Sequence, residues 1–321
     1  MVERTPTTPT AKRAQALKAG SSAGERLTRA ALLRMEIFPP APPVAPYVTT
    51  FFRLRCDEKV IRDVHPSSLG LIAVMARGTG QIRFIDGRTQ PSHPFTVITP
   101  TNAAATFELD GPWSAFGAML SPLGWASLTG LSAEAHGNQL LEGSAVLSRE
   151  LVDAGNSILA GIDQFSEAEM IELLSVAILQ SLRPLPAGHA EFVKLVADWL
   201  AESLSPNIDE LNVRCGYSGR HVQRLTERYF GLPPSALARK YRALRAAVLL
   251  SRPSLSADEV AAVQDHFYDQ SHMIREMRLF AGRTPARIAD PDTPYLAAFM
   301  DLRDFRKSGP RMAPIPDDLR A

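Results

Sequence analysis

The C-terminal half of the chain contains the same short pattern twice. His221-Val-Gln-Arg224 returns as His272-Met-Ile-Arg275, and Gly231-Leu-Pro-Pro234 returns at the same separation as Gly282-Arg-Thr-Pro285. An internal repeat means that one supersecondary unit is built twice, so it constrains the architecture more than any single residue does. We therefore expect two similar units in this part of the chain.

The first copy predicts a helix, a tight turn and a second helix. Ile208 and Leu211 are spaced to lie on one face of a short helix that ends near Gly216. A glycine suits the backbone of a tight turn because it has no side chain to strain. Ser218 follows, and its hydroxyl can cap a second helix that runs to about Phe230. This order of elements is that of a helix-turn-helix unit.

The second helix of this copy has an apolar face and a polar face. Val222, Leu225 and Tyr229 recur at steps of three and four residues, so they face the core. A DNA-reading helix meets base edges with its first turns, where Arg and Gln offer paired donors and acceptors. The candidate DNA-reading positions on the opposite face are Gly219, Arg220, Gln223 and Arg224.

The second copy predicts the same arrangement. Val260 to Gln264 supplies its first helix, and Asp269 can cap its second helix. Met273, Met277 and Phe280 then face inward. The candidate DNA-reading positions on the outer face are Gln270, Ser271, Ile274, Arg275 and Arg278.

Between the two copies, Ser235 to Leu250 predicts one long helix. The stretch from Arg214 to Arg252 contains nine Lys or Arg residues and one acidic residue, Glu227. Such an excess of positive charge indicates contact with a polyanion, and a solvated basic face is the alternative. Phosphate contacts supply affinity and position rather than sequence preference. The residues of the long helix that we expect to contact phosphates are Arg239, Lys240, Arg242 and Arg245.

The two units and the helix between them resemble the DNA-binding region of the AraC (arabinose-operon regulator) family of bacterial transcription regulators. The matching segments are Ser218 to Arg224, Arg242 to Leu250, Phe267 to Arg275 and Phe280 to Pro285. The resemblance implies that the candidate positions lie on two recognition helices and that the partner is double-stranded DNA. It also implies an N-terminal sensing or dimerising domain, often a cupin-like β barrel.

Two positions depart from the family pattern. His266 stands where a glycine is usual in the turn of the second unit, so we expect that turn to be reshaped. Asn212 stands where an alanine is usual in the first unit, so we expect it to need a buried hydrogen-bond partner. The first unit is therefore expected to dominate base readout.

The N-terminal half has a different texture. Short apolar runs between Tyr47 and Leu120 are separated by turn-forming residues, which predicts an antiparallel sandwich or barrel. Helical patterns follow at 122–128, 148–161 and 167–182, for which packing on the sheet is favoured over a dimer seam. The predicted fold is thus α+β. The predicted segments are a flexible leader at 1–45, a sensing or dimerisation domain at 46–185, a DNA-binding domain at 186–290 and a tail at 291–321.

Catalytic and metal-binding motifs are missing from the sequence. Cys56 and Cys215 lie far apart and form no CxxC pair, and no G-x-S-x-G or phosphate-cradling loop is present. His65 and His93 lack a His-x-His pattern and are interpreted as surface or loop histidines, and Trp113 is interpreted as a core residue. We expect neither an enzyme nor a cofactor or metal.

The leading functional hypothesis is a sequence-specific, DNA-binding transcription regulator in the cytoplasm. Hydrophobic residues make up 45% and charged residues 21% of the chain, and no apolar run reaches the ~20 residues that cross a bilayer, so we expect no membrane partner. An unidentified small-molecule effector would act through the N-terminal domain. RNA polymerase is a further expected partner, and the protein would be a monomer or a homodimer. The alternative is a protein-interaction adaptor that keeps the helix-turn-helix fold without sequence-specific DNA binding.

Overall fold

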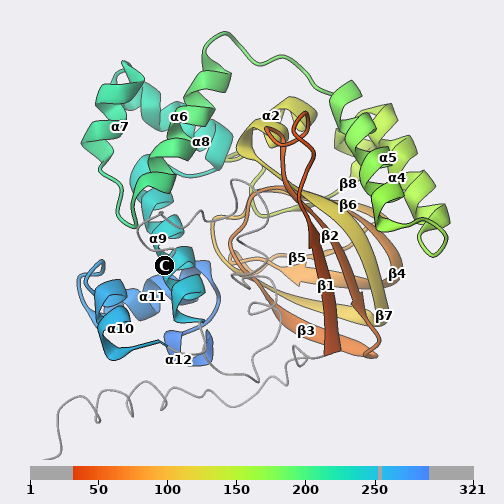
Figure 1. Cartoon of the computed structure of the whole chain (residues 1–321), viewed down its shortest axis with the longest axis horizontal. Helices are drawn as coiled ribbons and strands as arrows, with labels where there is room; N and C mark the ends of the chain where they lie inside the picture. The colour runs from red at the N-terminus through yellow and green to blue at the C-terminus, as the bar shows by residue number, and fades with distance from the viewer. Residues whose placement is uncertain (1–31, 252–254, 289–321) are drawn as a thin grey trace, which may run out of the picture.

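The structure is a computed structural model that describes residues 32–251 and 255–288. Its N-terminal half is an antiparallel sheet with helices, and its C-terminal half is helical (Figure 1). The predicted α+β fold is confirmed. The predicted tail at 291–321 and most of the predicted leader lie outside the described residues.

Eight strands form the sheet. They are β1 (Leu33–Phe38), β2 (Val48–Cys56), β3 (Val60–His65), β4 (Leu71–Arg83), β5 (Thr89–Pro91), β6 (Phe95–Ile98), β7 (Ala105–Leu120) and β8 (Leu140–Glu142). The strand order is β1-β2-β7-β4-β6-β8, with β3 paired to β7 and β5 paired to β4. β7 is the central strand, since its first half pairs with β3, its second half pairs with β2, and both halves pair with β4.

Strand β1 corrects the predicted leader. Leu33 to Phe38 pair in register with Cys56 to Phe51 of β2, so the ordered sheet begins well before residue 46. The composition of residues 1–45 indicated little burial, but Leu33 is buried in the sheet's core. A short edge strand is stabilised by pairing with its neighbour, and its own residues do not predict that pairing.

Both faces of the sheet are apolar. Neighbouring residues of a strand point to opposite faces, so Phe51 and Phe52 belong to two different cores. The helices of this half are α2 (Pro122–Thr129), α3 (Gly143–Val146), α4 (Arg149–Gly161) and α5 (Glu167–Gln180). Leu151 of α4 and Met170 of α5 are buried in the core that contains Phe51, so these helices cover one face of the sheet. The other face carries Phe52, which lines the cavity on the inside of the curved sheet.

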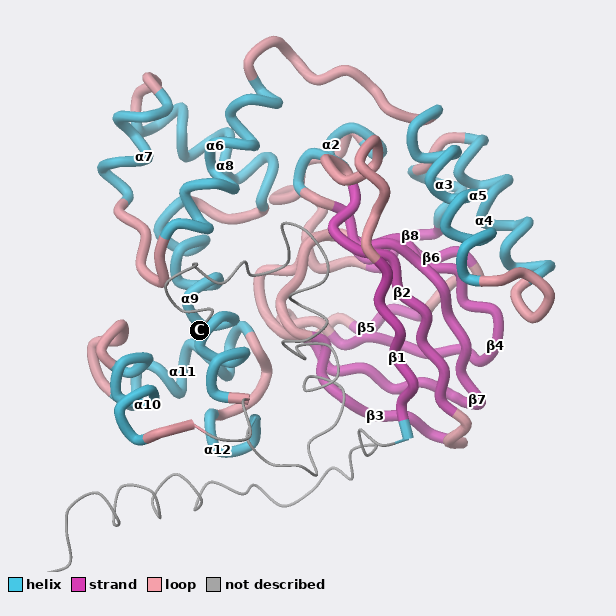
Figure 2. Tube along the Cα trace, in the orientation of Figure 1, coloured by secondary structure: helices cyan, strands magenta, loops and turns pink. Residues whose placement is uncertain are grey.

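The C-terminal helices share one core. They are α6 (His189–Glu202), α7 (Ile208–Cys215), α8 (Gly219–Phe230), α9 (Pro234–Leu250), α10 (Ala257–Gln264), α11 (Gln270–Phe280) and α12 (Pro285–Ile288). Helix α9 connects the group α6–α8 to the group α10–α12 (Figure 2). We call the sheet with α2–α5 the β domain, and α6–α12 the helical domain.

Candidate functional site

The first helix-turn-helix unit consists of α7 and α8. Asn207 caps α7 by accepting a hydrogen bond from the backbone N of Asp209 at 2.9 Å, and α7 ends at Gly216, whose φ of 63° is left-handed. Nothing lies within 4 Å of the position that a Cβ would take at Gly216, so the backbone conformation alone favours glycine here. Ser218 caps α8, because its Oγ accepts a hydrogen bond from the backbone N of His221 at 3.4 Å.

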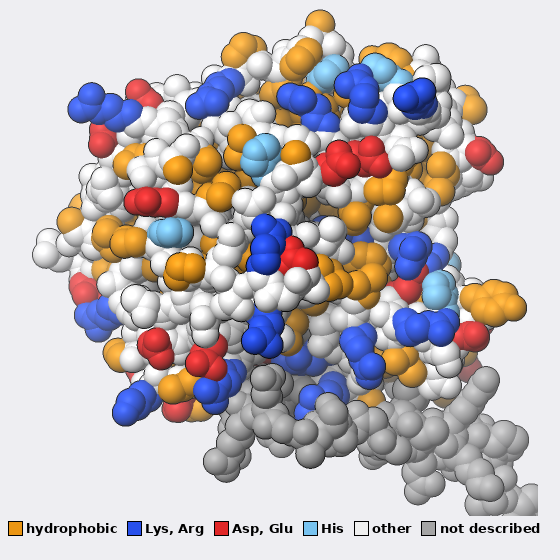
Figure 3. All heavy atoms as spheres, turned by 180° about the vertical axis from the view of Figure 1, so that it is seen from behind, with side chains coloured by type: hydrophobic (Ala, Val, Ile, Leu, Met, Phe, Trp, Pro, Cys, Tyr) orange, Lys and Arg blue, Asp and Glu red, His pale blue; other side chains and the backbone are white. Residues whose placement is uncertain are grey.

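The outer face of α8 is polar and open to solvent. Gln223 donates a hydrogen bond from Nε2 to Oε1 of Glu227 at 2.9 Å, which keeps its amide on this face. The N-terminal end of a helix carries a partial positive charge that adds to that of Arg side chains. Lys and Arg side chains are visible on the surface of the helical half when the molecule is viewed from behind (Figure 3). The exposed residues on this face of α8 include all four predicted positions, Gly219, Arg220, Gln223 and Arg224.

The turn of the second unit differs from that of the first. The backbone N of Phe267 donates to the carbonyl of Gln264, so the chain continues to wind after the end of α10. Within residues 32–251 and 255–288, Asn138 is the only non-glycine residue with a positive φ, so His266 is free of left-handed strain. The turn is reshaped as the sequence predicted. The expectation for Asn212 is wrong, because this side chain is only half-buried and needs no buried partner.

Helix α11 is capped and amphipathic as predicted. Oδ1 of Asp269 accepts a hydrogen bond from the backbone N of His272 at 2.6 Å. Met273, Met277 and Phe280 are buried. The predicted outer positions divide into exposed Ser271, Arg275 and Arg278, and half-buried Gln270 and Ile274.

Two of the basic residues expected to contact phosphates are buried instead. Lys240 is 2% exposed, and its Nζ donates to the carbonyls of Ser68 at 3.1 Å and Thr101 at 2.8 Å in the β domain. Arg245 is fully buried and donates to the carbonyls of Leu200 and Ser203 at the end of α6. In this arrangement neither side chain can reach DNA, so their prediction as phosphate contacts is corrected.

The other two basic residues of α9 are held by one carboxylate. Glu276 of α11 is 2% exposed and accepts hydrogen bonds from Arg239 Nε at 2.6 Å and from Arg242 Nη2 at 2.7 Å. The sequence placed both arginines on a phosphate-binding face. In the folded protein, both arginines form ion pairs with Glu276 of α11 instead.

The recognition helices dock on the β domain through equivalent backbone atoms. The carbonyl of Arg228, in the last turn of α8, accepts a hydrogen bond from the backbone N of Ala133 at 2.7 Å. The carbonyl of Leu279, at the matching position of α11, accepts one from Ala104 N at 2.8 Å. The next carbonyl, of Phe280, accepts one from a further loop of the β domain. Both recognition helices thus place their C-terminal ends on the β domain.

A buried ion pair lies in this interface. Nη2 of Arg283 lies 2.5 Å from Oδ1 of Asp63, and the two side chains are 6% and 0% exposed. Gly282 lies so close to Val64 that a Cβ at this position would stand 2.2 Å from the valine Cγ1. No sequence pattern predicts this interface, since Asp63 is one of many acidic residues in the β domain and no local motif identifies Arg283 as its partner.

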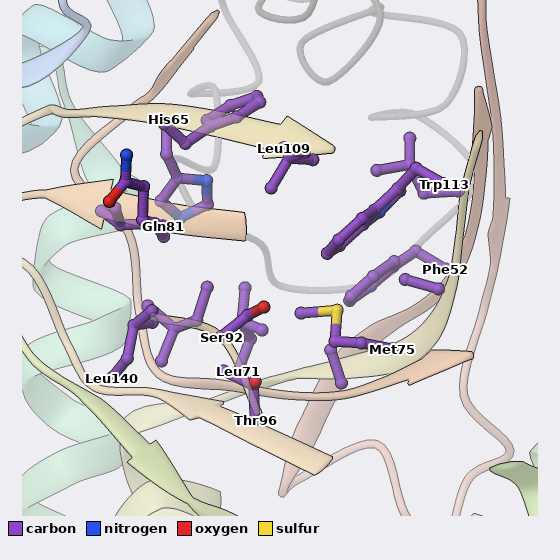
Figure 4. A pocket seen from close by; sticks show the side chains of 16 residues that line it. Phe52, His65, Leu71, Met75, Gln81, Ser92, Thr96, Leu109, Trp113 and Leu140 are labelled. Carbon is purple, nitrogen blue, oxygen red and sulfur yellow. The ribbon is translucent and has the colours of Figure 1, made fainter. Parts of the chain in front are cut away.

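The curved sheet of the β domain lines a cavity of about 70 Å³ (Figure 4). Its lining is mainly apolar, with Phe52, Leu71 and Trp113 among the side chains that face it. Trp113 is a core residue as expected, and it also forms part of this wall. The polar side chains in the lining are His65, Gln81, Ser92 and Thr96.

His65 links the cavity to the helical domain. It is 4% exposed, which corrects its interpretation as a surface or loop histidine. Its Nε2 lies 3.0 Å from Oγ of Ser68, and the carbonyl of Ser68 accepts a hydrogen bond from Lys240. Burial and then the charge of Lys240 lower the pKa of His65 to about 4, and burial lowers the pKa of Lys240 to about 7. His65 is therefore neutral at pH 7.

Residues 32–251 and 255–288 contain no group of three His, Cys, Asp or Glu side chains placed to hold a metal ion. Among the described residues, no helix combines the length and the hydrophobicity of a transmembrane span.

Two helix-turn-helix units on one connecting helix make up most of the helical domain. Residues 212–290 match a protein-family model described as "Helix-turn-helix domain". This domain is of the AraC type found in transcription regulators. Catalytic activity has no support in that match. None of the curated proteins compared with the chain matches it.

Several solved structures are similar to the chain at low sequence identity. ToxT from Vibrio cholerae O395 is 8% identical, with 83% of this chain and 100% of ToxT covered and a TM-score of 0.43. Unsaturated fatty acid bound ToxT from V. cholerae strain SCE256 is 10% identical, with 81% and 95% covered and a TM-score of 0.43. The AraC-like transcriptional activator CuxR is 11% identical, with 67% and 86% covered and a TM-score of 0.30.

Proposed function

We propose that the protein is a sequence-specific DNA-binding transcription regulator whose activity depends on a small ligand in the β domain. The observation that carries the first part is the exposed group Arg220, Gln223 and Arg224 at the start of α8, inside a domain of the AraC type. Bidentate donors in the first turns of a recognition helix read base edges in the major groove. The first unit provides the main readout, because its predicted positions are all exposed, whereas Gln270 and Ile274 are half-buried.

Sequencing the genomic DNA fragments that the protein retains tests this part. A shared motif among those fragments then supplies the site for affinity measurements. Arg224→Ala should weaken binding to that site by about 1–3 kcal/mol if it contacts a base, with a much smaller effect on random-sequence DNA. Arg149→Ala is the matched control, because this arginine is 90% exposed on α4 of the β domain. Equal affinities of both variants for the motif would remove Arg224 from the proposed readout.

The second part of the proposal concerns the cavity of the β domain. Among the described residues, none that lines the cavity is a Lys, Arg, Asp or Glu, and His65 is neutral at pH 7. A charged ligand would lose its hydration in such a cavity without gaining a counter-charge. The ligand is therefore a small uncharged molecule, mostly apolar, with a polar group that meets His65 or Gln81. A ligand that moves His65 also disturbs Ser68, to which Lys240 of α9 is bonded.

A matched pair of small molecules tests the charge preference. We expect 1-butanol to shift the methyl NMR signals of Leu71 and Met75, which line the cavity, and butyrate to leave them unchanged. Ala115→Leu fills the cavity from the same wall and should remove the response. Stronger shifts with butyrate would contradict the assignment of an uncharged ligand.

The adaptor hypothesis was favoured by two features of the second unit, His266 and a face that is only modestly basic. His266 has no positive φ, so the first feature no longer favours an adaptor. Salt-dependent binding that is tighter for the shared motif than for random-sequence DNA would decide against an adaptor. Contact with RNA polymerase, the state as monomer or homodimer, and cytoplasmic location stay predictions from the sequence.

A further inference from the structure

Glu276 is a buried acid at a position where the first unit has an apolar residue. The separation that relates His221 to His272 also relates Leu225 to Glu276. Leu225 is fully buried in the helical core, and Glu276 is 2% exposed. Burying a carboxylate is unfavourable unless nearby charges and hydrogen bonds compensate. The substitution of an acid for a core leucine therefore needs a physical reason.

The carboxylate of Glu276 has partners at both oxygens. Oε1 accepts from Arg239 Nε at 2.6 Å and lies 3.1 Å from Nε2 of His272. Oε2 accepts from Arg242 through Nη2 at 2.7 Å and Nε at 3.3 Å. The guanidinium of Arg242 also lies over the ring of Phe267, 5.0 Å from its centre. We call Glu276, Arg239, Arg242 and His272 the α9–α11 clamp.

The clamp engages positive charge of α9 in ion pairs. Arg239 remains 49% exposed at the side chain, so it can reach solvent once it is released, while Arg242 is 16% exposed. With Lys240 and Arg245 buried, all four basic residues that the sequence places on the phosphate-binding face of α9 have partners within the protein. Few basic side chains of α9 are therefore left to contact the phosphates of DNA beside the second unit.

We propose that Glu276 is a positioning residue for DNA binding, which withholds Arg239 and Arg242 from the DNA backbone and fixes α11 against α9. This inference rests on the proposed DNA-binding function. Contact by the second unit is then left to the exposed side chains of α11, Ser271, Arg275 and Arg278. The first unit has no such restraint on α8, since its equivalent residue is Leu225.

The salt dependence of DNA binding tests the clamp. Each phosphate contact contributes about 0.9 to the slope of log K against log salt concentration on duplex DNA. The probe is a labelled random-sequence duplex, titrated with the full chain at salt concentrations from about 50 to about 200 mM. Arg239→Gln should leave the slope of the wild-type protein unchanged, because Arg239 is bound to Glu276. A slope that falls by about 0.9 in this variant would overturn the proposal.

Neutralising the acid gives the opposite test. Glu276→Gln keeps the shape of the side chain and releases one or both arginines, so the slope should steepen by up to about 1.8. The triple variant with Arg239→Gln and Arg242→Gln should return to the wild-type slope. If Glu276→Gln does not fold, Glu276→Leu takes its place, because leucine is the residue at the equivalent position of the first unit, Leu225. An unchanged slope in a folded variant of either kind contradicts the clamp.

Failure of the clamp and failure of the proposed function give different results. If the wild-type protein binds no duplex at any salt concentration, the proposed DNA-binding function itself is wrong. If the wild-type protein binds DNA and Glu276→Gln does not alter the slope, only the clamp is wrong. Thermal unfolding of Glu276→Gln, Arg242→Gln and the double variant checks the clamp without DNA. Additive effects of the two substitutions would show that these side chains are not coupled.

Discussion

Neutralising Asp63 tests whether a buried charge pair holds the two domains together. In the folded protein, Oδ1 of Asp63 accepts a hydrogen bond from the backbone N of Val64 at 2.6 Å. Asp63→Asn keeps a side-chain oxygen that can accept this bond. It also removes the negative charge of Asp63 from beside the guanidinium of Arg283, which is 6% exposed. Removing one partner of a buried ion pair costs about 3–5 kcal/mol. We expect a loss of that size in the free energy that docks the helical domain on the β domain.

An exposed ion pair of nearly the same geometry is the control. Arg77 and Asp163 are 2.6 Å apart, and their side chains are 56% and 60% exposed. Asp163→Asn therefore removes the same kind of charge at a site where a pair contributes about 0–1 kcal/mol. The comparison isolates burial, because the residue types, the substitution and the distance are matched.

Urea unfolding and limited proteolysis measure the effect. Trp199 reports on the helical domain, and Trp113 and Trp125 report on the β domain, so loss of docking appears as two fluorescence transitions instead of one. Proteolysis between α5 and α6 should also become faster. Replacing both partners, with Asp63→Leu and Arg283→Met, should restore most of the stability. Equal losses in Asp63→Asn and Asp163→Asn would refute the argument from burial.

Three further predictions concern local features. Ser218→Ala removes the cap of α8 and should lower the unfolding free energy by about 1 kcal/mol in urea titrations, and an unchanged value would show that the 3.4 Å bond contributes little. Gly216→Ala places a side chain at a φ of 63° and should cost about 1–2 kcal/mol in the same assay, whereas a neutral result would mean that the turn relaxes. The unfolded protein binds more protons than the folded protein when a folded pKa is lowered, so stability rises with pH across the interval between the two values. His65 should contribute such a rise from about pH 4 to 6.5, and Lys240 from about pH 7 to 10.5. His65→Gln and Lys240→Met should each flatten the matching part of the stability profile, and a retained slope would assign it to other groups.

The sequence by itself determined the two helix-turn-helix units. Ser218 caps the start of α8, Asp269 caps the start of α11, and Gly216 ends α7. These signals act over three or four residues, and helical periodicity then assigns each side chain to an inner or outer face. The exposed positions of α8 follow from that periodicity alone. The family resemblance added the expectation of DNA as the partner.

Only the tertiary structure decided what the outer faces meet. Periodicity tells which side of α9 is polar, but Lys240 is buried there by loops of the β domain from more than a hundred residues away, and Arg239 and Arg242 are engaged by α11. The burial of His65 beside the cavity depends in the same way on the curvature of the whole sheet. Contacts between distant segments depend on the complete packing, so no local pattern encodes them. The two units found as a sequence repeat are thus one module built twice, and docking and the clamp make them unequal.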